Sequence, residues 1–239
     1  MKLIDKILEV LYPSRCACCG ELNGGGHLCN DCENAISEQR IIGKLCRYCG
    51  HEKHNCQCNK YHYLFEGVCA PFYNRDTAQQ GVYMFKFQNA PYCADYFGKQ
   101  MAETIRLRFK NIEFDAVCFV PSTKKSSRNR KYDYVELLAK KVSKELKLPL
   151  SPKLLKKIRD TEKQHTLTSD KRQSNVKGAY KATKHIDGKT VLLIDDIKTT
   201  GYTLNECAKQ LRMMGADKVY CATALLSANM SCNGSKNGI

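Results

Sequence analysis

The sequence predicts an α/β protein with a parallel sheet and helices on both faces, preceded by a small cysteine-rich module. Two observations lead to this prediction. After Tyr63, apolar segments of strand length alternate with amphipathic segments of helix length. Nine of the 15 cysteines lie between Cys16 and Cys58, where large aliphatic residues are few. We therefore expect a cysteine-rich unit over residues 1–62 and an α/β domain over residues 63–239.

Four close cysteine pairs follow one another at the front of the chain. They are Cys16/Cys19, Cys29/Cys32, Cys46/Cys49 and Cys56/Cys58, the first three spaced C-x-x-C and the last C-x-C. A C-x-x-C knuckle lets two thiolates reach one zinc ion at about 2.3 Å, and four thiolates complete a tetrahedral site. Eight ligands therefore fit two zinc ions, as in a double zinc ribbon.

The pairing of these ligands stays open in the sequence. Pairing in order would join the first two pairs and the last two pairs, and an interleaved pairing is also possible. His51 or His54 could replace one cysteine of the weaker C-x-C pair, and Cys18 is expected to be a spare. Closed four-ligand sites leave no open position for catalysis, so we expect the metal to be structural. The module could still contact nucleic acid or a partner protein.

Three strands and two helices can be assigned in the α/β part from their patterns. The expected elements are a strand over 115–121, a helix over 132–146, a strand over 191–195, a helix over 204–214 and a strand over 219–226. Gly215 is the expected stop of the second helix. Strands separated by helices of this length imply right-handed crossovers, and hence a parallel sheet.

Polar residues crowd the end of the middle strand, in the segment VLLIDDIKTTGYT (191–203). If the strand ends at Asp195, residues 197–201 form a loop and a helix begins at Tyr202. The free N–H groups and positive end of such a helix suit a phosphate dianion, and Gly201 allows close approach. Asp195 and Asp196 suit sugar hydroxyls or Mg²⁺. The segment therefore predicts a ribose 5-phosphate site, the alternative being threonines that only cap a helix.

The segment resembles the motif of type I phosphoribosyltransferases that binds 5-phosphoribosyl 1-pyrophosphate (PRPP). The chain as a whole resembles the ComF family, whose members are competence proteins linked to DNA uptake in naturally transformable bacteria. The resemblance rests on the cysteine-rich front, FVP (119–121) before a basic loop, VELLA (135–139), RDTEKQ (159–164), Leu167, Arg172, NVKGAY (175–180) and TLNEC (203–207). It implies a type I phosphoribosyltransferase fold behind the zinc-ribbon module.

The resemblance also implies roles for individual residues. The ribose hydroxyls would be held by Asp195 and Asp196, and the 5-phosphate by Thr199, Thr200, Gly201 and Thr203. The pyrophosphate, with Mg²⁺, would be held by Pro121, Ser122, Thr123 and Lys124. Residues 156–178 would form a mobile loop over the site, carrying Arg159, Gln164 and Arg172, although a surface linker fits their composition nearly as well.

Two segments depart from the family pattern. RKYDY (130–134) stands where the family shows Arg-Gly-aromatic-Asn-Gln, and Lys198 and Tyr202 stand where small or apolar residues are commoner. We expect phosphate binding to survive these changes. The acceptor and the catalytic rate stay open.

The net charge of +15 is concentrated between Ser122 and Lys189, where 20 Lys and Arg face 7 Asp and Glu. This surplus fits a solvated surface or a polyanionic partner. Two functions are therefore expected. One is a Mg²⁺- and PRPP-dependent transferase acting in DNA uptake. The other is a non-catalytic protein that senses a nucleotide or binds single-stranded DNA, with Tyr132 and Tyr134 stacking on bases.

The partners expected are PRPP or a ribose 5-phosphate ligand, single-stranded DNA and proteins of the competence machinery. No apolar run is long enough for a transmembrane helix, and the first residues have helical spacing interrupted by charges rather than the core of a signal peptide. We expect a cytoplasmic protein without membrane insertion.

Overall fold

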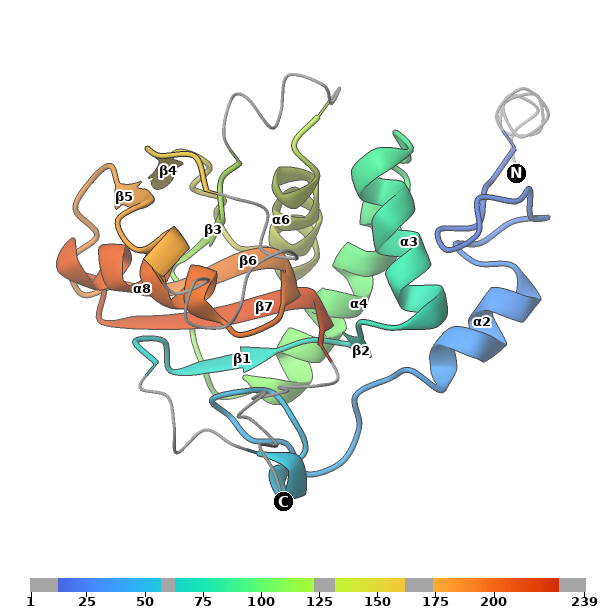
Figure 1. Cartoon of the computed structure of the whole chain (residues 1–239), viewed down its shortest axis with the longest axis horizontal. Helices are drawn as coiled ribbons and strands as arrows, with labels where there is room; N and C mark the ends of the chain where they lie inside the picture. Colours follow the sequence, from blue (N-terminus) through green and yellow to red (C-terminus); the bar gives the residue numbers. More distant parts are fainter. Residues whose placement is uncertain (1–12, 57–62, 123–131, 162–173, 228–239) are drawn as a thin grey trace, which may run out of the picture.

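The computed structural model describes residues 13–56, 63–122, 132–161 and 174–227 (Figure 1). Its centre is a parallel sheet in the order β1-β7-β6-β3, in which β2 also pairs with β7. The strands are β1 (Gly67–Cys69), β2 (Phe72–Tyr73), β3 (Ala116–Phe119), β6 (Thr190–Lys198) and β7 (Lys218–Leu226). The parallel sheet predicted from the sequence is confirmed.

The register of the sheet places the ends of two strands side by side. Phe119, the last residue of β3, pairs with Ile194 of β6. Because β3 and β6 are parallel, the loop that follows Phe119 leaves the sheet beside Asp195. The two segments expected to form the ligand site therefore meet at one edge.

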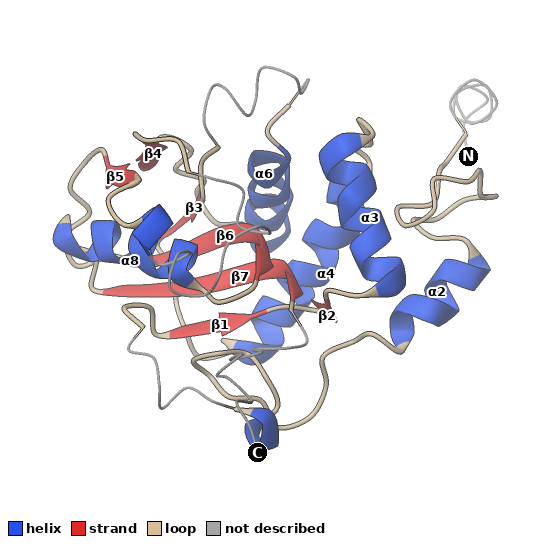
Figure 2. Ribbon diagram, viewed as in Figure 1, coloured by secondary structure: helices blue, strands red, loops and turns tan. Residues whose placement is uncertain are grey.

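Helices cover both faces of the sheet (Figure 2). Leu192 and Ile194 of β6 belong to a core with helices α3 (Asp76–Phe87), α4 (Cys93–Arg108) and α6 (Tyr134–Leu146). Val191 and Leu193 face the other way, into a core with α8 (Tyr202–Met213) and the antiparallel pair β4 (Leu155–Lys157) and β5 (Tyr180–Ala182). Successive strand residues point to opposite faces, so a uniformly apolar strand serves both cores.

The middle strand is longer than predicted. We expected it to end at Asp195, with a loop over 197–201, but β6 runs to Lys198 because Ile197 and Lys198 pair with Leu225 and Leu226 of the equally long β7. The loop is correspondingly shorter. The helix after it begins at Tyr202, as predicted.

The first predicted helix begins two positions later than expected. Asp133 is its N-cap and accepts hydrogen bonds from the N–H groups of Val135 (3.0 Å) and Glu136 (3.2 Å), so α6 begins at Tyr134. Elements that the sequence patterns did not predict are α2 (Asn30–Ser37), η1 (Lys53–Asn55), β1, β2, α3, α4, β4 and β5.

The cysteine-rich segment packs directly against the α/β part. Cys16 and Cys18 are buried in the same core as Phe97 of α4. Arg47 accepts a hydrogen bond at its carbonyl from Val68 (2.9 Å) and donates one to the Tyr220 hydroxyl (2.8 Å). The boundary expected between residues 62 and 63 lies at the edge of a stretch outside the described residues, and it stays a prediction.

None of the helices in the described ranges is both long and apolar enough to cross a membrane.

Candidate functional site

The turn between β6 and α8 forms the floor of the candidate site. Gly201 is the N-cap of α8 with φ 85°, a left-handed conformation that glycine adopts readily, and no side chain in the described part of the chain caps this helix end. A Cβ at this position would lie 3.3 Å from both the Lys198 and Tyr63 side chains. The first N–H groups of a helix have no partner within it, so this end can bind an anion.

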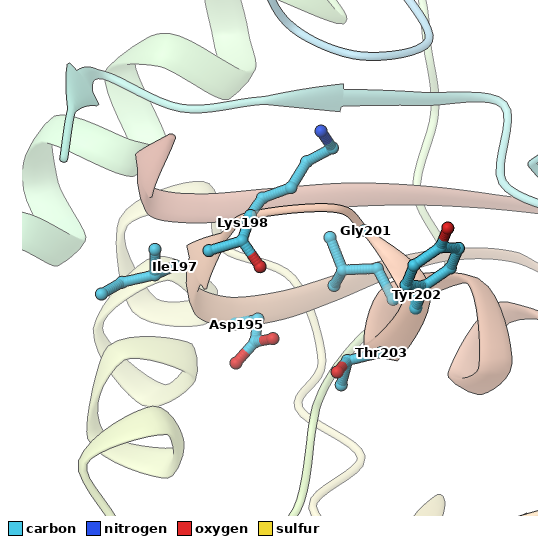
Figure 3. Close-up of a pocket in the computed structure, with 8 residues that line it drawn as sticks. Asp195, Ile197, Lys198, Gly201, Tyr202 and Thr203 are labelled. Atoms are coloured by element: carbon cyan, nitrogen blue, oxygen red, sulfur yellow. The ribbon is translucent and has the colours of Figure 1, made fainter. Parts of the chain in front are cut away.

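A small pocket opens between the strand end and the helix (Figure 3). Its lining residues are Asp195, Ile197, Lys198, Thr199, Gly201, Tyr202, Thr203 and Leu204. Figure 3 shows the Asp195 carboxylate and the Thr203 side chain on one side of the turn, with the Lys198 amine directed to the other side. The pocket thus joins a carboxylate to a helix N-terminus, the two features expected for a ribose 5-phosphate.

Two residues predicted for this site, Thr200 and Asp196, are not among the residues that line the pocket. Thr200 contributes its carbonyl to a hydrogen bond from the Tyr63 hydroxyl (3.1 Å), which fixes the turn from behind. Asp196 lies next to Asp195 but is not among the lining residues, because its carboxylate meets Lys86 of α3. The pair of acids is therefore divided between the pocket and the neighbouring helix.

Both acids are largely buried, each with about 9% of its surface exposed. The Asp196 N–H donates to Asp195 Oδ1 (2.9 Å), and the Ile197 N–H donates to Asp196 Oδ1 (2.5 Å). Burial, together with the neighbouring Asp196 charge, raises the pKa of Asp195 well above its ordinary value, although the Asp196 N–H and Lys86 act in the opposite direction. Burial and the adjacent charge therefore favour a proton or a cation at Asp195.

Lys198 was expected in the loop of residues 197–201, but it belongs to the strand, although it still lines the pocket. It is the last residue of β6, and its side chain is 1% exposed. Its ammonium lies 6.0 Å from the centre of the Tyr63 ring, on the far side of the turn from Asp195. Lys198 therefore supports the turn from behind.

The loop after β3 begins beside the acids. The Ser122 hydroxyl donates a hydrogen bond to Asp133 Oδ2 (2.6 Å), and Asp133 is also the N-cap of α6. The segment at residues 130–134, which differs from the ComF family pattern, therefore contains a residue that connects this loop to a helix. Of the residues predicted to hold the pyrophosphate, Pro121 and Ser122 are described and half-buried. Thr123 and Lys124 lie outside the described residues.

The predicted mobile loop is described only at its two ends. Arg159 is exposed and donates to the carbonyls of Asn175 (2.8 Å) and Lys177 (2.9 Å), which joins those ends. The Gly178 N–H donates to Glu206 of α8 (3.0 Å). Gln164 and Arg172 lie outside the described residues, so the roles predicted for them stay predictions.

Two lysines near the acids were not predicted from the sequence. Lys86 of α3 forms an ion pair with Asp196, and Lys157 of β4 lies near enough to Asp195 for the charge of that acid to act on it. Burial lowers the pKa of Lys157, and the charges of Asp160 and Asp195 oppose this effect. The only sequence feature that pointed to Lys157 was the excess of basic residues between Ser122 and Lys189. No sequence feature pointed to Lys86.

The cysteines gather into two groups. The sulfur atoms of Cys16, Cys19, Cys29 and Cys32 lie within 4.8 Å of one another, and so do those of Cys46, Cys49 and Cys56. This grouping follows the pairing in order, and Cys58, the fourth predicted member of the second group, lies outside the described residues. Four converging thiolates fit a tetrahedral zinc ion and leave no open position.

The two groups share a backbone design. In each knuckle the first cysteine donates to a carbonyl five residues on, from Cys16 to Glu21 (2.8 Å) and from Cys46 to His51 (2.7 Å). Neither candidate histidine joins a cysteine group in the described ranges. His51 Nε2 lies 2.9 Å from the carbonyl oxygen of Ser227, and His54 pairs with Glu52 at 3.2 Å.

Cys18 is fully buried and belongs to neither group within the described residues. Burial raises the pKa of its thiol, which disfavours the thiolate that a metal needs. The structure agrees with the expectation that Cys18 is a spare.

Two protein-family models match the two parts of this chain. Residues 7–70 match the double zinc ribbon domain and residues 136–237 match the phosphoribosyl transferase domain. Together with the cysteine groups, the first match indicates structural zinc. Among solved structures, a hypoxanthine phosphoribosyltransferase from Staphylococcus aureus is similar at 18% identity and a TM-score of 0.37, over 61% of this chain and 67% of that one.

Curated relatives are similar over different shares of their length. Competence protein F of Haemophilus influenzae is 25% identical over 203 residues, which cover 80% of this chain and 87% of that protein. DNA utilization protein YhgH of Escherichia coli K12 is 29% identical over 105 residues, which cover 44% of this chain and 46% of that protein. Together, these relatives and the matches to a double zinc ribbon domain and a phosphoribosyl transferase domain support a ComF-family protein.

Proposed function

We propose that this protein binds PRPP with Mg²⁺ at the turn between β6 and α8, and that it acts as a phosphoribosyltransferase in DNA uptake for natural transformation. One observation carries the proposal: the Asp195 carboxylate and the N-terminus of α8 line the same pocket. A carboxylate accepts hydrogen bonds from ribose hydroxyls, and a helix N-terminus binds phosphate. The names of the relatives, which refer to competence and DNA utilization, support the cellular role.

In the proposed reaction an acceptor nucleophile forms a bond to C1 of the ribose while the bond from C1 to the pyrophosphate oxygen breaks. The pyrophosphate leaves with the electron pair of that bond. Mg²⁺, bound with PRPP, would neutralise charge on the pyrophosphate. The protein would hold the ribose at Asp195 and the phosphate at α8, and the loop that begins at Pro121 would face the leaving group.

Titration calorimetry with PRPP and Mg²⁺ tests the binding step. We expect the wild type to bind and the Asp195→Ala/Asp196→Ala variant to lose affinity by roughly tenfold or more, since it loses hydrogen bonds to a charged group. Asp187→Ala is the matched control because Asp187 is an exposed acid in the turn before β6. Absence of binding by the wild type would overturn the proposal. Release of pyrophosphate from PRPP then tests catalysis.

A second function, binding of single-stranded DNA, is favoured by the antiparallel pair β4–β5. Lys156 and Lys181 are exposed and stand directly opposite each other, an arrangement that destabilises a strand pair. In the described part of the chain, neither forms an ion pair, and neither do the nearby exposed Lys153, Lys177 and Lys184. A polyanion bound here would relieve the repulsion.

The tyrosines expected to stack on bases do not support this second function. Tyr132 and Tyr134 are half-buried, and both pack against Phe85, with ring centres 5.8 and 6.0 Å away. Binding would therefore rest on charge. The affinity for an oligothymidylate should fall with salt, and the Lys156→Ala/Lys181→Ala variant should reduce the slope of log K against log salt by about 1.4, or 0.7 for each lost phosphate contact. An unchanged slope would exclude this surface.

A further inference from the structure

Lys86 reaches the acidic pair from an element with no part in the predicted motif. It lies in the last turn of α3, and its side chain is only 14% exposed. Its ammonium is 2.5 Å from Asp196 Oδ2 and 5.3 Å from the centre of the Tyr134 ring. The lysine thus lies between the end of β6 and the beginning of α6.

The end of α3 is fixed in place, so Lys86 is not a mobile surface lysine. The carbonyl of Phe85 accepts a hydrogen bond from the Tyr132 hydroxyl (2.9 Å). The Phe85 ring is 1% exposed and packs against Tyr132 and Tyr134, which flank the N-cap of α6. Contacts on both sides of Asp133 therefore hold the backbone that carries Lys86.

The ion pair sets the orientation of Asp196. One carboxylate oxygen accepts the Ile197 N–H and the other meets Lys86, so the backbone and α3 hold the group from two directions. The Asp196 N–H in turn donates to Asp195, which lines the pocket. A change in the orientation of the Asp196 carboxylate would therefore also displace Asp195, which lines the pocket.

Lys86 also compensates the charge of two adjacent, buried carboxylates. No other lysine or arginine in the described ranges lies within ion-pair distance of either acid. The other ionisable groups whose charges act on the pair include Asp133, Lys157 and Tyr180. Leaving a buried charge without its partner is strongly unfavourable, so an uncharged side chain at position 86 should let the acids rearrange.

We propose that Lys86 is a positioning residue for ribose recognition: its ion pair with Asp196 holds the acidic pair in the orientation that accepts the hydroxyls of a ribose 5-phosphate. This inference rests on the proposed function, because it places the ribose part of the ligand at Asp195, which accepts a hydrogen bond from Asp196. It adds that α3, although remote in sequence from the motif, contributes to the choice between ribose and deoxyribose ligands.

The test compares three ligands, namely ribose 5-phosphate, 2-deoxyribose 5-phosphate and inorganic phosphate. Calorimetry with each would be done on the wild type, Lys86→Met and Lys86→Arg. Lys140→Met is the matched control because Lys140 also forms an ion pair, with Glu136 of the same helix at 2.8 Å. Lys140 is 54% exposed and remote from the motif in sequence. The melting temperature of each variant reports whether the fold is kept.

We expect the wild type and Lys140→Met to prefer ribose 5-phosphate to its deoxy form by roughly tenfold or more, the effect of one hydrogen bond to a charged group. Lys86→Met should lose most of this preference while it binds inorganic phosphate as the wild type does. Lys86→Arg should restore the preference because a guanidinium keeps the charge. A purely structural lysine would not change the ratio between the two sugar ligands.

The outcomes separate this inference from the proposed function. If the wild type binds neither sugar phosphate, or does not distinguish them, the proposed function fails and the inference fails with it. If the wild type distinguishes them and Lys86→Met does so equally well, the role of Lys86 is excluded while the proposed function stands. An equal loss of all three ligands in Lys86→Met, or tighter binding of ribose 5-phosphate, would also overturn the inference.

Discussion

At the scale of single residues, the site depends on a turn that favours glycine and on an acid held in an unfavourable environment. Gly201 has a positive φ and is crowded by Lys198 and Tyr63. Asp195 is buried next to a second carboxylate. Such local costs commonly mark functional positions, where the surrounding structure maintains them. Each cost leads to a measurable prediction.

Replacing Gly201 by alanine should weaken phosphate binding as well as the fold. Alanine at this position would have to adopt the left-handed backbone conformation, which costs about 1–2 kcal/mol. Its Cβ would also lie 3.3 Å from the Lys198 and Tyr63 side chains. Gly188→Ala is the control, because Gly188 also has a positive φ of 69° but no atom within 4 Å of an added Cβ. Denaturant unfolding should show the larger loss for Gly201→Ala, and calorimetry should show weaker phosphate binding in that variant alone. Equal losses in both would mean that the crowding at Gly201 has no effect.

The raised pKa of Asp195 predicts how stability depends on pH. In the folded state this carboxyl binds its proton more tightly than in the unfolded chain, so the folded state holds more protons once the pH exceeds the ordinary value of 3.8. The free energy of unfolding then falls as pH rises from about 4 to the folded pKa, and the loss is complete above it. Asp195→Asn removes this contribution. Its free energy of unfolding should decline less over that range than that of the wild type, as denaturation at a series of pH values would show; parallel curves would contradict the prediction.

At the scale of elements, the sequence predicted what depends on neighbours in the chain. The strand near Val191, the helix at Tyr202 and the cysteine knuckles follow from local patterns. Lys198 could not be assigned to β6 from local patterns, because its strand conformation depends on pairing with Leu226 of β7. Lys86 was missed for a similar reason: it lies in an ordinary amphipathic helix, and only tertiary packing brings that helix to Asp196. The first knuckle, predicted and observed, allows a sharp test.

Metal content should distinguish a zinc ligand from its neighbour. Cys16 and Cys18 are both fully buried, but only Cys16 belongs to a cysteine group in the described ranges. We expect the wild type to hold two zinc ions per chain, Cys16→Ser to lose one of them, and Cys18→Ser to keep both. Elemental analysis of the purified proteins measures this. A loss of zinc in Cys18→Ser, with the metal kept in Cys16→Ser, would reverse the assignment.

At the scale of the whole molecule, the zinc-ribbon segment and the sheet are interlocked. Ile41 donates a backbone hydrogen bond to Pro71 (2.9 Å) and packs in a small core with Leu226 at the end of β7. Cys16 and Cys18 are buried with residues of α4. The two units expected from the sequence therefore share apolar cores, which composition alone could not show.

Shared cores predict that the zinc-ribbon segment and the α/β part unfold together. Calorimetry should show one transition whose calorimetric and van't Hoff enthalpies agree, as for a two-state protein. A chelator that removes zinc should lower the melting temperature of that whole transition, because metal bound only by the folded state stabilises the entire cooperative unit. Hydrogen exchange at Leu192 and Leu193, in the centre of the sheet, reports on the α/β part alone. If the chelator leaves exchange there unchanged, or if two transitions separate, the segments are independent domains and their contacts contribute little to stability.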